Sequence, residues 1–218
     1  MDTNLELQVN LKQSNEKVMY NIIKRGVDFV AACIGLLVLS PVFIIVAILI
    51  RIDSKGPIIF GHTRVGRNGQ KFKVYKFRSM VVNAKEVFDN FTKEQKEEFE
   101  KNFKLDNDPR ITKIGAILRK TSLDELPQLF NIIKGDMSIV GPRPIVEKEI
   151  EKYGEDFKKV FSVKSGLTGY WQANGRSDTT YEERVKMDLY YVNNRSLLLD
   201  IKIILKTFIS VIKKKGAV

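Results

Sequence analysis

The sequence predicts an α+β protein that is mostly helical and forms a membrane-associated, monotopic domain. Three observations predict this class. An uncharged apolar segment carries a proline at its midpoint, an Asn-Gly pair separates two short strand-like runs, and the C-terminal segment is amphipathic at helical spacing. Together they predict an N-terminal re-entrant membrane helix broken at Ser40-Pro41, a small β-hairpin and amphipathic interfacial helices.

The composition favours an anionic partner and argues against several kinds of site. The 218 residues suit one domain with an added segment, and 37 Lys and Arg against 26 Asp and Glu give a net charge of +11. Cys33 is the only cysteine, which argues against an internal disulfide framework. His62 is the only histidine, which argues against a His-rich metal site and a Ser-His-Asp triad. A nucleic-acid partner is not predicted, because carboxylates intersperse the basic residues and a long apolar segment has no role there.

The segment Phe29–Ile50 holds 22 residues without a charge. As a straight helix it would be about 33 Å long, so length alone favours a single transmembrane helix. Ser40-Pro41 at its midpoint and basic residues on both flanks favour a helix that enters, bends and leaves by the same face, because positive charge marks the cytoplasmic side. We predict the re-entrant form over residues 21–52, after a polar lead-in at residues 1–20 and before a domain at residues 53–218.

The later segments have simpler patterns. Ile58–Phe60 and Phe72–Phe77 are typical of strands, and Asn68-Gly69 between them is a strong hairpin-turn signal. Residues 84–103 predict one or two solvated helices with a modest apolar stripe and no chemistry. The C-terminal helix is expected to pack on the core, or to lie in a lipid interface, through one face. That face holds Ile201, Ile204, Leu205, Phe208 and Ile212.

Asp124 and Glu125 are adjacent acids with two interpretations. Ser122 and Glu125 fit the S-x-x-E capping box, but Pro127 then falls beyond the first turn, so a helix starting at Asp124 fits better. Alternatively, one carboxylate attacks phosphorus and the other helps to hold Mg²⁺. Basic residues crowd this part of the chain: Arg110, Lys113, Arg119, Lys120, Lys134 and Arg143.

The motifs of the chain resemble those of the bacterial sugar transferases, the monotopic polyprenol-phosphate phosphoglycosyl transferases. The resemblance runs from Lys24 to Lys213 through "KRGVD", the Ser40-Pro41 pair, "GPIIFGHTRVGRNGQKFKVYKFRSM", "DPRITKIGAILRKTSLDELPQLFNIIKGDMSIVGPRP", "GLTGYWQANGRS" and "DLYYVNNRSLLLDIKIILKT". The length resembles the minimal form of the family, without an added N-terminal transmembrane bundle.

The resemblance implies an enzyme that moves a phosphosugar from a UDP-sugar to polyprenol (undecaprenyl) phosphate and releases UMP. It starts a capsule, exopolysaccharide, O-antigen or glycoprotein glycan on the cytoplasmic face of the bacterial inner membrane. Residues 53–218 would be the catalytic domain, anionic lipid a further partner and a homodimer an open alternative. The family motifs do not identify the sugar.

Roles of individual residues also follow from the resemblance. Asp124 is expected to be the nucleophile, and Glu125 to bind Mg²⁺, with Asp124 as a further candidate ligand. Arg119 would contact the phosphates, and Arg143 would hold the nucleotide-sugar together with its neighbours Pro142 and Pro144. Lys76 and Arg176 would lie around the anionic substrates. A rival prediction from another class is a non-catalytic, membrane-bound polybasic scaffold, which would not need Asp124.

Overall fold

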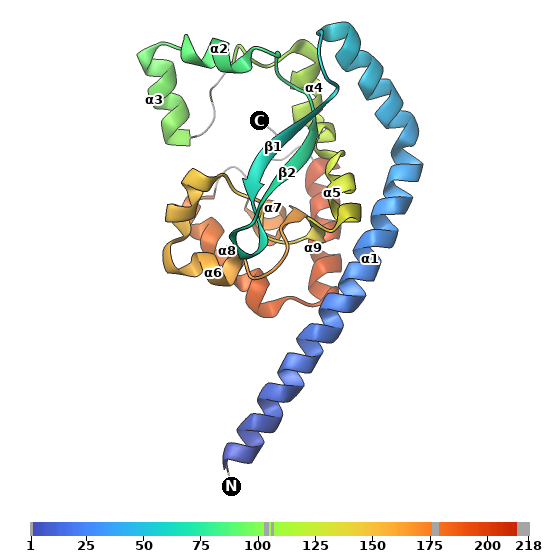
Figure 1. Cartoon of the computed structure of the whole chain (residues 1–218), viewed down its shortest axis with the longest axis vertical. Helices are drawn as coiled ribbons and strands as arrows, with labels where there is room; N and C mark the ends of the chain where they lie inside the picture. Colours follow the sequence, from blue (N-terminus) through green and yellow to red (C-terminus); the bar gives the residue numbers. More distant parts are fainter. Residues whose placement is uncertain (1, 103–104, 106, 176–178, 213–218) are drawn as a thin grey trace.

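The structure, a computed structural model, describes residues 2–102, 105, 107–175 and 179–212 (Figure 1). One long helix, α1 (Asp2–Asp53), runs along one side of a body built mainly of shorter helices. Two small sheets lie in the described part of this body: an antiparallel pair β1–β2 and a parallel pair β3–β4. The predicted mostly helical α+β class is confirmed.

α1 continues through Pro41, which differs from the predicted break. Pro41 has no N–H to donate to the carbonyl of Leu37, one turn earlier. The hydroxyl of Ser40 donates to that carbonyl instead, at 2.8 Å. The freed acceptor is therefore satisfied without unwinding the helix, and α1 curves over its second half, as Figure 1 shows. The boundary predicted at residues 20 and 21 falls inside this helix and stays a prediction.

One face of α1 packs on the body and the other is exposed and apolar. Ala32 packs against Leu129 and Ile132, while Val46 and Ile50 join Phe77 in a second cluster. In the described part of the chain, only Lys17–Asp53 is long and apolar enough to cross a membrane. Its exposed apolar side chains include Val27, Val30, Ile34, Leu37, Val38, Ile44, Ile45, Ile48 and Ile52.

The predicted β-hairpin is confirmed. β1 (Ile59–Val65) pairs with β2 (Lys71–Phe77) through the short turn η1 (Arg67–Gly69). Asn68 and Gly69 both have positive φ, of 55° and 76°, which is the conformation an Asn-Gly turn supplies. The register places Phe60 opposite Lys76 and Arg64 opposite Phe72.

The charge-rich segment after the hairpin forms α2 (Ala84–Asp89) and α3 (Lys93–Asn102), as predicted. Their phenylalanine stripe surrounds a cation: the Arg110 guanidinium lies 5.0–5.1 Å from the rings of Phe88, Phe91 and Phe99. Arg110 also binds Asp108 through its Nη2 at 2.6 Å. Arg110 is therefore a buried structural residue, although the sequence pattern grouped it with the basic residues near the acid pair.

The acid pair lies between two helices, α4 (Lys113–Thr121) and α5 (Gln128–Lys134). Ser122 ends α4 in the left-handed conformation, with φ 57°, and its side chain makes no cap hydrogen bond. The capping-box interpretation is therefore wrong. Leu123–Glu125 form the single 3-10 turn η2, and Pro127 stands directly before α5, where its missing N–H does no harm.

The rest of the chain closes the body around a short parallel pair. β3 (Ser138–Val140) pairs with β4 (Gly166–Thr168). Between them lie η3 (Glu147–Asp156) and α6 (Phe157–Val160), and after β4 come α7 (Tyr170–Asn174), α8 (Tyr181–Asn194) and α9 (Leu197–Ile212). The main apolar cluster of this half contains Val65, Ile145, Tyr153, Val160, Phe161 and Val185.

α9 packs on the body through Ile203 and only partly through the predicted face. Ile203 is buried against Val140 and Tyr191, whereas Ile201, Leu205 and Phe208 are more than half exposed. The buried face also carries Asp200, whose partners Tyr191 and Lys24 satisfy it there. Of the predicted stripe, Ile201, Leu205 and Phe208 face outward from the body, whereas Ile204 packs partly against the core.

Candidate active site

Glu125 lines a pocket, and Asp124 directly precedes it at the turn that joins α4 to α5. Asp124 is almost fully buried, with 7% of its surface exposed. The positive φ of Ser122 ends α4 abruptly, so the next residues turn back toward the hairpin. This turn brings both carboxylates to the end of β2, which is far from them in the sequence.

Lys76 of β2 contacts both carboxylates. Its Nζ lies 2.7 Å from Oε1 of Glu125 and 3.6 Å from Oδ2 of Asp124. The strand is fixed from the α5 side, because the Tyr75 N–H donates to Oδ1 of Asn131 at 2.9 Å. The sequence-predicted grouping of Lys76 with the acid pair therefore agrees with the geometry.

Arg143 approaches the same carboxylate from the opposite side. Its Nη2 lies 3.5 Å from Oε1 of Glu125. The loop that carries it follows β3 and is held at both ends: the Gly166 N–H donates to the Pro142 carbonyl, and Ile145 exchanges hydrogen bonds with Val65. A Cβ at Gly141 would lie 2.4 Å from a backbone oxygen of the β4 side, so only glycine permits this approach.

The predicted neighbours of Arg143 have different places. Pro144 lines the pocket, whereas Pro142 is buried outside this lining and accepts a hydrogen bond from the Gly166 N–H through its carbonyl. Arg119, in the last turn of α4, was predicted to contact phosphate and donates from Nε to Oγ of Ser79 at 2.9 Å. Its charge acts on the neighbouring Asp124. Arg176 lies outside the described residues.

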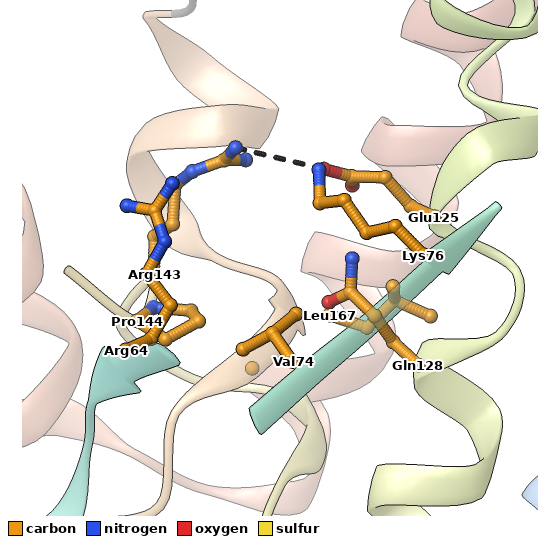
Figure 2. Close-up of a pocket in the computed structure, with 9 residues that line it drawn as sticks. Arg64, Val74, Lys76, Glu125, Gln128, Arg143, Pro144 and Leu167 are labelled. Atoms are coloured by element: carbon orange, nitrogen blue, oxygen red, sulfur yellow. Dashed lines mark hydrogen bonds and ion pairs between the residues drawn. The ribbon is translucent and has the colours of Figure 1, made fainter. Parts of the chain in front are cut away.

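Figure 2 shows the pocket between these groups, with arginines on one side and Glu125, Lys76 and Gln128 on the other. Its lining residues are Arg64, Val74, Lys76, Glu125, Gln128, Arg143, Pro144, Gly166 and Leu167.

Five members of this lining were not among the predicted site residues: the polar side chains Arg64 and Gln128, and Val74, Gly166 and Leu167. A signal for Arg64 was present, because the hairpin register puts Arg64, Phe72, Val74 and Lys76 on one face of the strand pair.

The charges of the pocket set the protonation of the acids. Burial raises the pKa of Asp124, and Lys76 opposes that effect. Burial alone would also raise the pKa of Glu125, but Lys76 and Arg143 together outweigh it and lower this pKa to about 2. Burial and the nearby cations Arg64 and Lys76 lower the pKa of His62 to about 4, so His62 is neutral at pH 7. Glu125 is thus a permanent anion beside a more basic, buried carboxylate.

A model of the family described as bacterial sugar transferase matches residues 19–214. The chain belongs to the bacterial sugar transferase family. The predicted resemblance is confirmed.

The names of three curated relatives of this family member agree with the family assignment. An "Undecaprenyl-phosphate galactose phosphotransferase" of Salmonella typhimurium is 47% identical over 216 residues, which cover 98% of this chain and 44% of the relative. A "UDP-galactose-lipid carrier transferase" of Erwinia amylovora is 48% identical over 212 residues, or 95% and 44%. The "Exopolysaccharide production protein ExoY" of Rhizobium meliloti is 47% identical over 199 residues, or 89% and 87%. The chain spans about half the length of the first two and most of the third.

The acid pair of this bacterial sugar transferase suits one kind of metal site. Within the described residues there is no cluster of three or more His, Cys, Asp and Glu that could enclose a metal ion. Mg²⁺ is commonly held by one or two carboxylates and completed by phosphate oxygens and water. Glu125, ionised at any physiological pH, and Asp124 beside it fit an ion that takes its other ligands from a phosphorylated substrate.

Proposed function

We propose that this bacterial sugar transferase moves a phosphosugar from a UDP-sugar to polyprenol phosphate, through a covalent intermediate on Asp124. The observation that carries the proposal is the pairing of a buried, basic carboxylate with three cations. Lys76 contacts Asp124, Arg143 contacts the adjacent Glu125, and Arg64 lines the same pocket. Such an arrangement supports nucleophilic attack on an anionic phosphorus.

In the first step, a carboxylate oxygen of Asp124 attacks the phosphorus that bears the sugar. The bond from that phosphorus to the bridging oxygen breaks, and the electron pair leaves with UMP. Asp124 then carries the phosphosugar as an acyl phosphate. Its raised pKa favours this role, because a more basic carboxylate is a better nucleophile once it is ionised, and Lys76 at 3.6 Å favours the ionised form.

In the second step, an oxygen of the polyprenol phosphate attacks the same phosphorus. The bond to Asp124 breaks, the carboxylate is restored, and the product is a polyprenyl diphosphate sugar. Each step exchanges one bond to phosphorus for another, so no oxidant or reductant is required.

The remaining groups position and neutralise phosphate. Arg143 and Arg64 lie across the pocket from Asp124's helix turn and suit the diphosphate oxygens, because the planar guanidinium matches phosphate geometry. Arg119 acts on Asp124 from the α4 side. Mg²⁺, when bound at Glu125, supplies neutralisation of the negative charge on the diphosphate. Lys76 lies near both carboxylates, so its positive charge favours their ionised forms and reduces the repulsion between them.

The membrane placement also belongs to the proposal. We infer that the exposed apolar face of α1, together with Ile201, Leu205 and Phe208 of α9, lies in the lipid of the bacterial inner membrane. The site then faces the cytoplasm, where a UDP-sugar is available and the lipid carrier presents its phosphate. The excess of basic residues suits anionic lipid. Basic residues stand before and after the apolar part of α1, so a course in which the curved, unbroken helix returns to the same face would keep both on the cytoplasmic side.

Labelling of single cysteines tests the topology. Cysteines at Asn10 and Lys55 should react with a membrane-impermeant reagent from the same side of sealed inverted vesicles. Labelling from opposite sides would establish a full span and contradict the monotopic proposal, without affecting the proposed chemistry.

The reaction is tested by UMP release from UDP-galactose with undecaprenyl phosphate and Mg²⁺. Wild type should release UMP and Asp124→Asn should not. With donor alone, mass spectrometry should find a phosphosugar on Asp124 of the wild type. Equal UMP release by both proteins would contradict the nucleophile role, and release by neither would favour the non-catalytic scaffold.

A further inference from the structure

Gln128 contributes a buried amide to the pocket that has no partner in the described part of the chain. Only 3% of the residue is exposed, and no described residue forms a hydrogen bond with its side chain. Figure 2 shows the amide pointing into the pocket beside Val74, Leu167 and the aliphatic stem of Lys76. The amide atoms are not fully enclosed but open onto the pocket, and no described residue bonds them, so a ligand in the pocket is the natural partner for them.

A second buried amide on the same helix, that of Asn131, is paired by hydrogen bonds, as expected for an amide with a structural role. Asn131 accepts a hydrogen bond from the Tyr75 N–H at 2.9 Å and donates to the Lys73 carbonyl at 2.7 Å. Asn131 therefore holds α5 against β2. Gln128 has no such role, although it is nearly as buried.

The position of Gln128 indicates which part of the UDP-sugar would lie next to it. It lies four residues after Asp124 and three after Glu125, which is the spacing of neighbours on a helical turn. The group nearest the attacked phosphorus on that side is the sugar, because the uridine is attached through the second phosphate. Charged residues already face the phosphates, whereas an uncharged amide with one acceptor and two donor hydrogens suits a hydroxyl group.

We propose that Gln128 hydrogen-bonds to a ring hydroxyl of the transferred sugar and so helps to select the UDP-sugar. This inference rests on the proposed function and adds to it a specificity-determining residue. The bond would lie beside the reacting phosphorus, so its loss should affect discrimination between sugars more than binding of the UDP portion.

The test combines changes in the protein with changes in the donor. UMP release is measured for wild type and Gln128→Met, with UDP-galactose, UDP-glucose and the 2-, 3-, 4- and 6-deoxy analogues of UDP-galactose. For wild type, removal of the recognised hydroxyl should lower kcat/KM by about tenfold. For Gln128→Met the same analogue should react about as fast as UDP-galactose, because the amide is already absent. The other deoxy positions should lower kcat/KM by the same factor in both proteins.

Two further measurements separate recognition from folding. Gln128→Met should melt at the same temperature as wild type or higher, because it replaces an unpaired amide with an apolar chain of similar length. Gln70→Leu, at an exposed position of the hairpin turn, is the matched control and should change none of the donor ratios.

Three outcomes would overturn the inference. The first is a deoxy pattern that is identical in wild type and Gln128→Met at every position. The second is an equal loss of rate for all donors in the variant. The third is a Gln128→Met protein that melts well below wild type, which would make the residue structural. Absence of UMP release by wild type from every donor is a different result, because it removes the proposed function and this inference falls with it.

Discussion

Replacing Lys76 by methionine should move the acid limb of the activity profile to higher pH. The substitution keeps the length of the side chain and removes the cation that contacts Asp124 at 3.6 Å and Glu125 at 2.7 Å. In the proposed mechanism Asp124 must be ionised to attack. Its pKa, already raised by burial, will rise further when this positive charge is removed.

The size of the shift follows from the distance. Two unit charges 3.6 Å apart interact by about 1.2 kcal/mol at a dielectric constant of 80 and by about 4.6 kcal/mol at 20. Since one pKa unit equals about 1.4 kcal/mol, these limits correspond to roughly one and three units. The side chain of Lys76 is 24% exposed, so solvent screens part of the interaction. We therefore expect the acid limb to move upward by about one to two pH units.

The assay is UMP release at saturating UDP-galactose, undecaprenyl phosphate and Mg²⁺, measured from pH 5 to pH 10. Lys76→Met should be slow at low pH and should recover part of its rate as pH rises through the new pKa. Lys71→Met is the matched control, because Lys71 pairs with Glu147 at 2.8 Å on the exposed surface, and its profile should overlay that of wild type.

A uniform loss of rate would refute this reasoning. If the Lys76→Met profile were lower than wild type by the same factor at every pH, Lys76 would not set the pKa of the nucleophile. Its role would then be limited to holding substrate.

Three other outcomes are expected. Glu125→Gln should raise the Mg²⁺ concentration for half-maximal UMP release by at least about tenfold, since one carboxylate ligand is lost; an unchanged Mg²⁺ titration would exclude Glu125 as a ligand. Arg110→Leu should lower the free energy of unfolding by about 3–5 kcal/mol, because it leaves Asp108 buried without its partner; chemical denaturation in detergent measures this, and a loss below about 1 kcal/mol would contradict the buried pairing. Burial raises the folded-state pKa of Asp188 to about 7, so this residue should make wild type less stable as pH rises from about 4 to 7. Asp188→Asn should remove this part of the pH dependence of stability, and thermal melts at pH 5 and pH 8 measure it.

The sequence was most informative where a backbone rule and a chemical requirement coincide. Asn68-Gly69 identified the hairpin turn, and that turn carries Lys76 to the site. Asp124 and Glu125 could be identified because Pro127 makes the capping box a poor explanation for two adjacent acids, which left a chemical role as the alternative. The family motifs then supplied the roles of the acids and of Arg143, and these roles stay predictions until the enzyme is assayed.

The missed residues depend on tertiary placement. Arg64 looked like one basic residue among many, and only its register in the hairpin puts it on the face of Lys76. Gln128 lies within the family motif that follows the acid pair, but it carries no charge, and its significance comes from its low exposure without a hydrogen-bond partner among the described residues. The course of α1 through Pro41 depends on one side-chain bond from Ser40, which helix propensity does not include.

The site is tied to α1 by two side chains, and this connects the chemistry to the membrane. Arg25 donates to the carbonyls of Ile132 and Ile133, at 2.6 and 2.8 Å, and so fixes the end of α5. Asp28, less than one turn later, accepts a hydrogen bond from the Ile139 N–H of β3 at 3.2 Å. α5 follows the turn with the acid pair, and β3 leads into the loop that carries Arg143. The two halves of the pocket are therefore both held to the helix that we place in the lipid, so the depth of α1 sets the depth at which the carboxylates meet the phosphate of the carrier.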